Sequence, residues 1–144
     1  MIIHILNRQK FWRPDTAALK QLIAFLLDKS GKCPVELSVI LTDDAGIRQI
    51  NRQFFDCDCA TDVISFTLPS RSGTGGPIGE IALNVERAIQ EGKKRRGFEH
   101  EFALYLAHGC DHLAGHTDRT VKERIKMRRR ELRWLKGASG HNLL

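Results

Sequence analysis

The chain has 144 residues, of which 42% are hydrophobic and 28% are charged, and these values are typical of one globular domain. No apolar run reaches the ~18 residues that a membrane-spanning helix needs, which excludes an integral membrane protein. The N-terminus shows neither a basic region before its apolar residues nor a small-residue cleavage site, so we expect no secretion signal. Four cysteines without a framework spacing are typical of a reducing compartment, where thiols stay free or bind metals. We therefore expect a cytoplasmic protein.

Positive charge is concentrated in one segment near the C-terminus. The whole chain carries a formal net charge of +6, from 23 Lys and Arg against 17 Asp and Glu. Between Arg119 and Lys136, nine basic residues stand against Glu123 and Glu131, so this basic segment alone carries +7. Localised positive charge is expected of a protein that binds a phosphate backbone, and a solvated helix face is the alternative.

The periodicity of apolar residues predicts an alternation of strands and helices. In chain order we expect a strand over 2–6, a helix opened by Pro14 and Asp15 and ended by Gly31, a strand over 35–41, a helix over 45–54, strands over 63–66 and 78–83, and helices over 85–95, 99–114 and 121–135. A flexible, glycine-rich connection is expected over 70–77 and a flexible tail over 137–144.

This order of elements predicts an α+β fold, with a small mixed sheet of about four strands packed with helices. No linker or internal repeat divides the chain, so we expect a single domain over residues 1–136. On the last helix, an apolar stripe predicts a face that packs inward and leaves the arginines in solvent. The stripe consists of Val121, Ile125, Leu132 and Leu135.

A histidine cluster at the end of the helix over 99–114 indicates a metal site. His108 and His112 are four residues apart, so both project from one helix face and can bind one divalent ion, as on a zincin helix. Gly115 is expected to end this helix, and a residue beyond the turn can supply a third ligand. Three protein ligands leave a fourth position for water, which is typical of a catalytic site.

Two other interpretations of the cluster are open at this point. His108 can instead be a hydrogen-bonded core residue and His112 a surface residue. A metalloprotease is disfavoured because its general base, a Glu after the first His, is replaced here by Gly109.

Four blocks of the sequence resemble the YbeY endoribonuclease family. The family's metal motif, His-Gly-x-x-His-Leu-x-Gly-x-x-His, is similar to the segment from His108 to Asp118, with Asp in the last place. The family's Asn-x-x-Tyr-Arg-x-x-Asp-x-x-Thr-(Asp/Asn)-Val-Leu-Ser-Phe resembles residues 51–66. The family's Gly-(Asp/Glu)-Ile block matches residues 79–81, and Glu123, Met127 and Glu131 suit its closing helix. In total the resemblance covers about residues 35 to 136 in collinear order.

The resemblance implies a zinc-dependent endoribonuclease that prefers single-stranded RNA, with one Zn²⁺ per chain. It further implies a role in ribosomal RNA maturation, at the 3′ end of the small-subunit RNA, and in ribosome quality control. The implied partners are ribosomal RNA and the ribosome or its small-subunit proteins. The implied metal ligands are His108, His112 and Asp118, although His116 is an alternative third ligand two residues earlier.

The remaining candidate residues concern the substrate and the proton. Phe55 occupies the position of an arginine in the family pattern, and we expect Arg52, about one helical turn before it, to contact phosphate in its place. Asp111 is a candidate for proton transfer or for supporting a ligand, with an exposed helix residue as the alternative. The residues expected to hold the RNA backbone are Arg128, Arg129, Arg130 and Arg133.

Smaller expectations concern three other side chains. Glu80 is a candidate hydrogen-bond partner for a ligand histidine. Cys57 and Cys59 are separated by one residue and make a poor chelating pair.

Two functions of other classes compete with the endoribonuclease. One is a ribosome-associated RNA-binding protein whose metal is structural. The other is a general metal-dependent hydrolase of peptides or small esters, which the missing His-Glu pair and the basic segment disfavour.

Overall fold

The computed structural model describes residues 2–31, 34–69 and 76–142, so most of the connection expected over 70–77 lies outside them. Within these ranges the chain forms four strands and five helices. They are β1 (Ile2–Asn7), α1 (Thr16–Ser30), β2 (Glu36–Thr42), α2 (Asp44–Phe55), β3 (Val63–Leu68), β4 (Ile78–Asn84), α3 (Val85–Lys94), α4 (Phe98–Leu113) and α5 (Val121–Gly140). None of the described helices is both long and apolar enough to cross a bilayer.

The sheet is mixed, with the strand order β1-β2-β4-β3. β2 runs parallel to both of its neighbours, and β3 pairs antiparallel with β4 at one edge. In the register, Val39 pairs with Ile5 on one side and with Ile81 on the other, and Ile81 also pairs with Ser65. The single α+β domain with a four-stranded sheet confirms the predicted fold class.

Short polar side chains begin the helices where the sequence predicts. Asp15, Asp43 and Asn84 are the N-caps of α1, α2 and α3, and each accepts a hydrogen bond from a backbone N–H of the first turn. Gly31 follows α1 with φ +78°, a left-handed conformation that glycine adopts without strain. Local chemistry therefore sets these helix ends.

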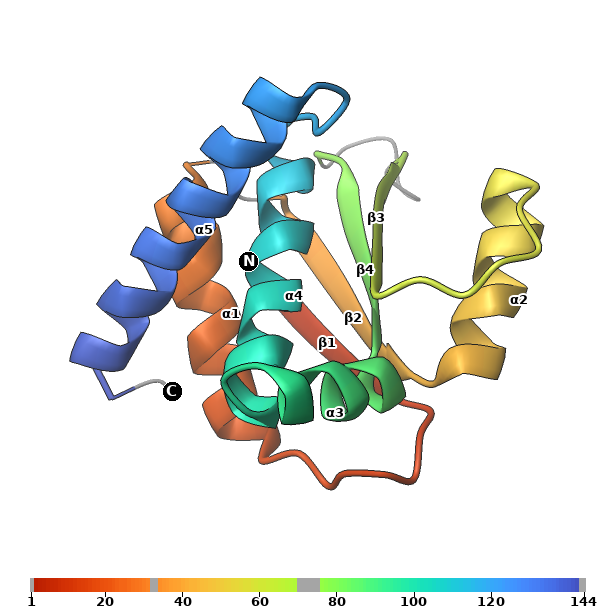
Figure 1. The fold of residues 1–144 in the computed structure, drawn as a ribbon. Helices are drawn as coiled ribbons and strands as arrows, with labels where there is room; N and C mark the ends of the chain where they lie inside the picture. The colour runs from red at the N-terminus through yellow and green to blue at the C-terminus, as the bar shows by residue number, and fades with distance from the viewer. Residues whose placement is uncertain (1, 32–33, 70–75, 143–144) are drawn as a thin grey trace.

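The helices cover the two faces of the sheet unequally (Figure 1). α1, α3, α4 and α5 pack together on one face, where the buried side chains of β2 and β4 form the main core. On the other face, Ile47 of α2 packs against Ile64 and Ala82 in a smaller cluster. α2 therefore stands apart from the other helices, beyond the edge strand β3 (Figure 1).

α4 lies closest to the sheet at Gly109. A Cβ atom at this position would lie 3.1 Å from Cγ2 of Ile81 on β4, so a larger residue would force the helix away from the sheet. Because Gly109 directly follows His108, the close contact also fixes the height of the histidines above the sheet.

The buried face of α5 differs from the predicted apolar stripe. Val121, Ile125 and Leu132 are exposed, and of the stripe only Leu135 is buried. The buried residues of α5 are Met127, Glu131, Trp134, Leu135 and Ala138. Their spacing of four, seven, eight and eleven residues from Met127 is that of one helix face. The prediction was wrong because this face includes the acidic Glu131, which a search for apolar residues passes over.

The end of α5 also differs from the prediction. The helix continues to Gly140 rather than ending at Leu135, and Ala138 is fully buried against the core. Residues 137–140 are therefore helical and do not belong to a tail. Of the expected tail over 137–144, residues 143–144 lie outside the described ranges.

Two cysteines form a bond that the sequence did not predict. Cys57 and Cys59 are joined by a disulfide in the loop between α2 and β3, whereas free or ligating thiols were expected. Cys110 on α4 is a free thiol and is buried in the main core.

A buried ion pair joins α4 to α5. Asp111 is fully buried, and both of its carboxylate oxygens accept hydrogen bonds from Arg130, from Nε at 2.9 Å and from Nη2 at 3.1 Å. This pairing is bidentate, the geometry in which a guanidinium binds a carboxylate most strongly. Arg130 is therefore a structural contact between two helices, and it is not exposed to solvent as the sequence suggested.

Replacing Arg130 by Met should destabilise the fold by about 3 kcal/mol, because Asp111 would keep its charge in the interior without the guanidinium. The control is Arg129→Met, since Arg129 is exposed, and its effect should stay within about 0.5 kcal/mol. Urea denaturation followed by circular dichroism measures both changes. Equal midpoints for the two variants would show that the ion pair does not stabilise the fold.

Candidate metal centre

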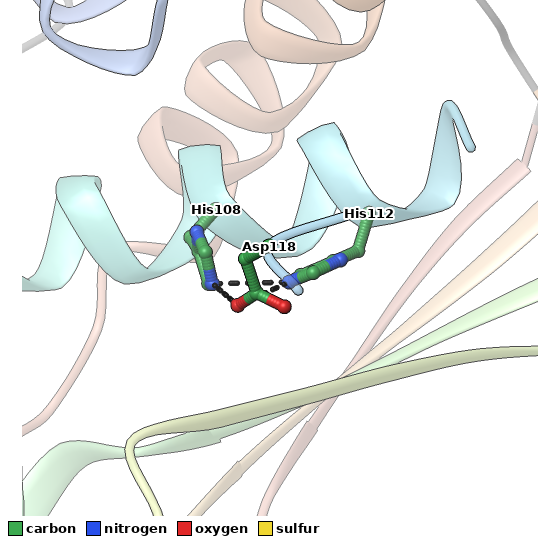
Figure 2. A group of neighbouring side chains, drawn as sticks. All are labelled: His108, His112 and Asp118. Atoms are coloured by element: carbon green, nitrogen blue, oxygen red, sulfur yellow. Dashed lines mark hydrogen bonds and ion pairs between the residues drawn. The ribbon is translucent and has the colours of Figure 1, made fainter. Parts of the chain in front are cut away.

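Three possible ligand atoms meet beside the C-terminal half of α4. His108 and His112 project from the same helix face, and their Nε2 atoms lie 3.1 Å apart. Asp118 reaches them from the loop after the helix, with Oδ2 at 3.7 Å from Nε2 of His108 and 3.5 Å from Nε2 of His112. Figure 2 shows the two rings and the carboxylate pointing toward one another. These are the three ligands that the sequence favoured, and together they form a group that could hold a metal ion.

The loop that carries Asp118 is held in place by several hydrogen bonds. α4 ends at Leu113, and Gly115 then adopts φ +99°, which reverses the chain as the sequence predicted. Glu123 of α5 accepts hydrogen bonds from Thr117 Oγ1 and from the backbone N–H of Arg119. The loop is thus fixed on both sides of Asp118, which orders the third ligand before any ion binds.

The Nδ1 atoms of both rings make hydrogen bonds within the protein, which leaves the Nε2 atoms available to a metal. His112 Nδ1 lies 3.0 Å from the backbone carbonyl of His116, which can only accept, so Nδ1 carries the proton. His108 Nδ1 donates to Oε2 of Glu131 at 2.7 Å. In the neutral rings both Nε2 atoms therefore present lone pairs to the same point, as metal-bound imidazoles do.

The spacing of the three donors suits a small tetrahedral ion. Ligand atoms about 2.1 Å from zinc lie about 3.4 Å from one another in tetrahedral geometry. The three donor pairs are 3.1, 3.5 and 3.7 Å apart. The donor set, two imidazoles and one carboxylate, is also one that zinc accepts with a fourth position left for water.

Glu131 supports the site. The sequence analysis did not single out this residue as a support. Its side chain is fully buried beneath His108, and its hydrogen bond fixes the ring's orientation and raises the basicity of Nε2. Burial lowers the pKa of His108, but the hydrogen bond and the negative charge of Glu131 outweigh it, so the pKa is raised. The available signal was an acidic residue at helical spacing from the buried Met127. Glu80, the partner suggested by the sequence, instead lines a hollow of the sheet with His4 and Glu36.

His116, the alternative third ligand, has another partner. Its Nδ1 lies 2.9 Å from Oδ1 of Asp111, the same oxygen that accepts from Nε of Arg130. Asp118, not His116, completes the group of donors. Asp111 itself is buried, so its reading as an exposed helix residue was wrong. Its contacts instead suit a supporting residue, since it holds both His116 and α5 in place.

An open groove of about 590 Å³ borders the metal group. Its walls come from α2, from the strand β3 and from the loop after α4, and they include Asn51, Phe55, Ser65, His112 and Thr117. Of the three possible ligands, His112 lies in the wall of this groove.

Arg52 is not among the described residues that line this groove. Its guanidinium is largely exposed and lies 4.0 Å from Oδ1 of Asp58, which Arg48 also binds at 2.7 Å. Phe55 lines the groove instead and packs edge-on against Phe66. The structure therefore places an aromatic wall at the position of the family's arginine, and Arg52, which was expected to contact phosphate instead, does not line the groove.

The arginines predicted to bind RNA occupy different environments. Arg129 and Arg133 are exposed on α5, as expected. Arg128 is half-exposed, with Nε 4.0 Å from Oε1 of the buried Glu131. Arg130 is held by Asp111.

A two-histidine, one-carboxylate group at the end of a buried helix, beside an open groove, is the kind of site that metal-dependent hydrolases use. The chain matches the family model described as "Endoribonuclease YbeY" over residues 4–139. It therefore belongs to the YbeY endoribonuclease family, as the motifs indicated.

Relatives and a solved structure agree with this assignment. The endoribonuclease YbeY of Syntrophotalea carbinolica is 34% identical over 137 residues, which cover 90% of this chain and 91% of the relative. That of Salinibacter ruber is 33% identical over 128 residues, covering 84% and 82% of the two chains. The solution structure of TM1509 from Thermotoga maritima is 26% identical, with a TM-score of 0.61, and the match covers 97% of this chain and 93% of that one.

Replacing Glu131 by Gln should weaken zinc binding by about 10- to 100-fold, because the amide cannot support His108 as a carboxylate does. Competition with a chelator of known zinc affinity measures the change. Glu99→Gln removes an exposed carboxylate from the first turn of α4, the helix that carries His108, and should leave the affinity unchanged. If Glu131→Gln folds normally and binds zinc as the wild type does, the proposed support of His108 is wrong.

Proposed function

We propose that the protein is a zinc-dependent endoribonuclease that prefers single-stranded RNA. The observation that carries this proposal is the convergence of His108, His112 and Asp118 beside a groove in a chain of the YbeY family. When bound there, zinc supplies the positive charge that lowers the pKa of a water molecule and stabilises a phosphoryl oxygen.

The chain's own residues contribute orientation and charge to this reaction. Glu131 and the carbonyl of His116 hold the two rings with Nε2 toward Asp118, so the ligands need little rearrangement. Asp118 adds a negative charge, so the net positive charge of the ion with its ligands is lower than it would be with three neutral histidines. On the surface, Arg129 and Arg133 supply positive charge that attracts an RNA backbone without reading its bases.

The cellular role that follows from this assignment is ribosomal RNA maturation, at the 3′ end of the small-subunit RNA, together with ribosome quality control. The family and the basic α5 support this proposal. The partners would be ribosomal RNA and small-subunit proteins, and the place of action would be the cytoplasm.

A second candidate is an RNA-binding protein of the ribosome whose metal is structural. The observation that favours it is Phe55, which lines the groove where an arginine is expected in an active member. The two candidates differ in one respect, since only the enzyme should lose cleavage on treatment with a chelator and regain it on addition of zinc.

Elemental analysis of the untagged protein should find close to one Zn²⁺ per chain. His112→Ala and Asp118→Ala should each lose most of this zinc, because each removes a ligand atom. His116→Ala should keep it, since His116 contacts Asp111 rather than the ligand group. Loss of zinc with His116→Ala alone would overturn Asp118 as the third ligand. A wild type free of metal after growth with zinc would overturn the zinc enzyme.

Charge reversal at Arg129 and Arg133 should weaken binding of single-stranded RNA and flatten its salt dependence. Each lost phosphate contact should lower the slope of log K against log salt by about 0.7. Filter binding over a range of salt concentrations measures both quantities. Arg130 stays unchanged in this variant, because its loss would disturb the fold. Equal slopes in variant and wild type would place the RNA elsewhere.

A further inference from the structure

A second hollow opens one helical turn from the metal group. Tyr105 precedes His108 by three residues on α4, so the two side chains lie on neighbouring positions of one helix face. Tyr105 lines a hollow of about 340 Å³ together with Arg87 of α3, Arg95 and Arg128 of α5. Arg87 on α3, Arg95 at the C-cap of α3 and Arg128 on α5 thus bring three guanidinium groups beside Tyr105.

One of these arginines already has two partners. Arg95 Nη1 lies 3.0 Å from Oε2 of the buried Glu101, and its Nη2 lies 3.9 Å from Glu91. Its charge is therefore balanced within the protein. Asp62, the other acidic residue that lines the hollow, accepts hydrogen bonds from the backbone N–H of Val63 and from Thr61 Oγ1.

The other two arginines keep most of their hydrogen-bonding capacity. Arg87 has no ion pair within the described ranges of the chain, and its backbone N–H is bonded to the N-cap Asn84. Among the residues that the structure describes, the one ion pair of Arg128 is the distant contact of 4.0 Å with Glu131 Oε1. Each guanidinium has five N–H donors in a planar fork, which matches the oxygens of a phosphate better than a single carboxylate oxygen.

Arg128 connects the hollow to the metal centre. It lines the hollow and approaches Glu131, whose other oxygen binds His108 Nδ1 at 2.7 Å. Glu131 is therefore the one residue between Arg128 and the possible metal ligand His108.

We propose that Arg87 and Arg128 form a phosphate subsite, which holds the RNA phosphodiester next to the one at the metal centre. The subsite rests on the proposed function, because it assigns the path of the RNA past the metal group. The strand enters from the groove beside Phe55, passes His112 and His108, and continues to Arg128 and Arg87. Two cations at one end of the path fix the strand's register relative to the metal.

The test compares wild type with the double variant Arg87→Gln, Arg128→Gln in the zinc-loaded protein. The probe is a short single-stranded RNA, with one neutral methylphosphonate linkage placed at each position in turn. Gels run after each titration confirm that the RNA is intact. The double variant should bind unmodified RNA roughly tenfold or more weakly, with a salt slope lower by about 0.7 and unchanged zinc content. In wild type, one particular neutral linkage should weaken binding most, and the double variant should lose that preference.

The control is Lys10→Gln with Lys20→Gln, which removes two exposed positive charges from residues that line neither the groove nor the hollow. It should retain the wild-type preference for the same linkage. If wild type binds RNA and the double variant loses affinity only as much as this control, the subsite is wrong and the proposed function stands. If the zinc-loaded wild type shows no salt-dependent RNA binding, both proposals fall.

Discussion

The hydrogen bond between Glu131 and His108 joins the last helix of the chain to the metal centre. A carboxylate is costly to bury unless a donor compensates it, and here the compensating donor is a ligand histidine. α5 must therefore dock on α4 for His108 to be oriented, and His108 must be in place for Glu131 to be buried. The folding of the C-terminal helix and the preparation of the metal centre are in this way one event.

The same helix pair shows how one basic segment serves several purposes. Successive residues on a helix point about 100° apart, so Arg128, Arg129 and Arg130 face three directions. Arg130 reaches Asp111 inside the protein, Arg129 faces solvent and Arg128 turns toward the hollow beside Tyr105. Because burial and charge repeat with the helical period, a high local charge does not make every arginine a binding residue.

On α4, the residue that packs closest against β4 and the two possible metal ligands lie within a few positions of one another. Gly109 lets the helix approach Ile81 of β4, while His108 and His112 on another face point toward Asp118 (Figure 2). Buried neighbours on nearly every side hold this helix rigidly, so the two Nε2 atoms keep their separation. Asp118, in contrast, reaches the site from a loop, and its position depends on Glu123 and the turn at Gly115.

The sequence by itself determined the fold class, most of the elements and the two histidine ligands, because helix caps, apolar periodicity and the His-x-x-x-His spacing are local properties. Asp118 as the third candidate ligand was implied by the resemblance to the YbeY motif. Only the tertiary structure decided which side chains support those ligands. Glu131 lies 23 residues from His108, and its role became visible only when α5 packed on α4. The buried stripe of α5 and the partner of Arg130 were hidden for the same reason. The role of a buried charged residue depends on the residue that it pairs with. When that partner is distant in sequence, tertiary packing brings the two together and no local sequence pattern shows it.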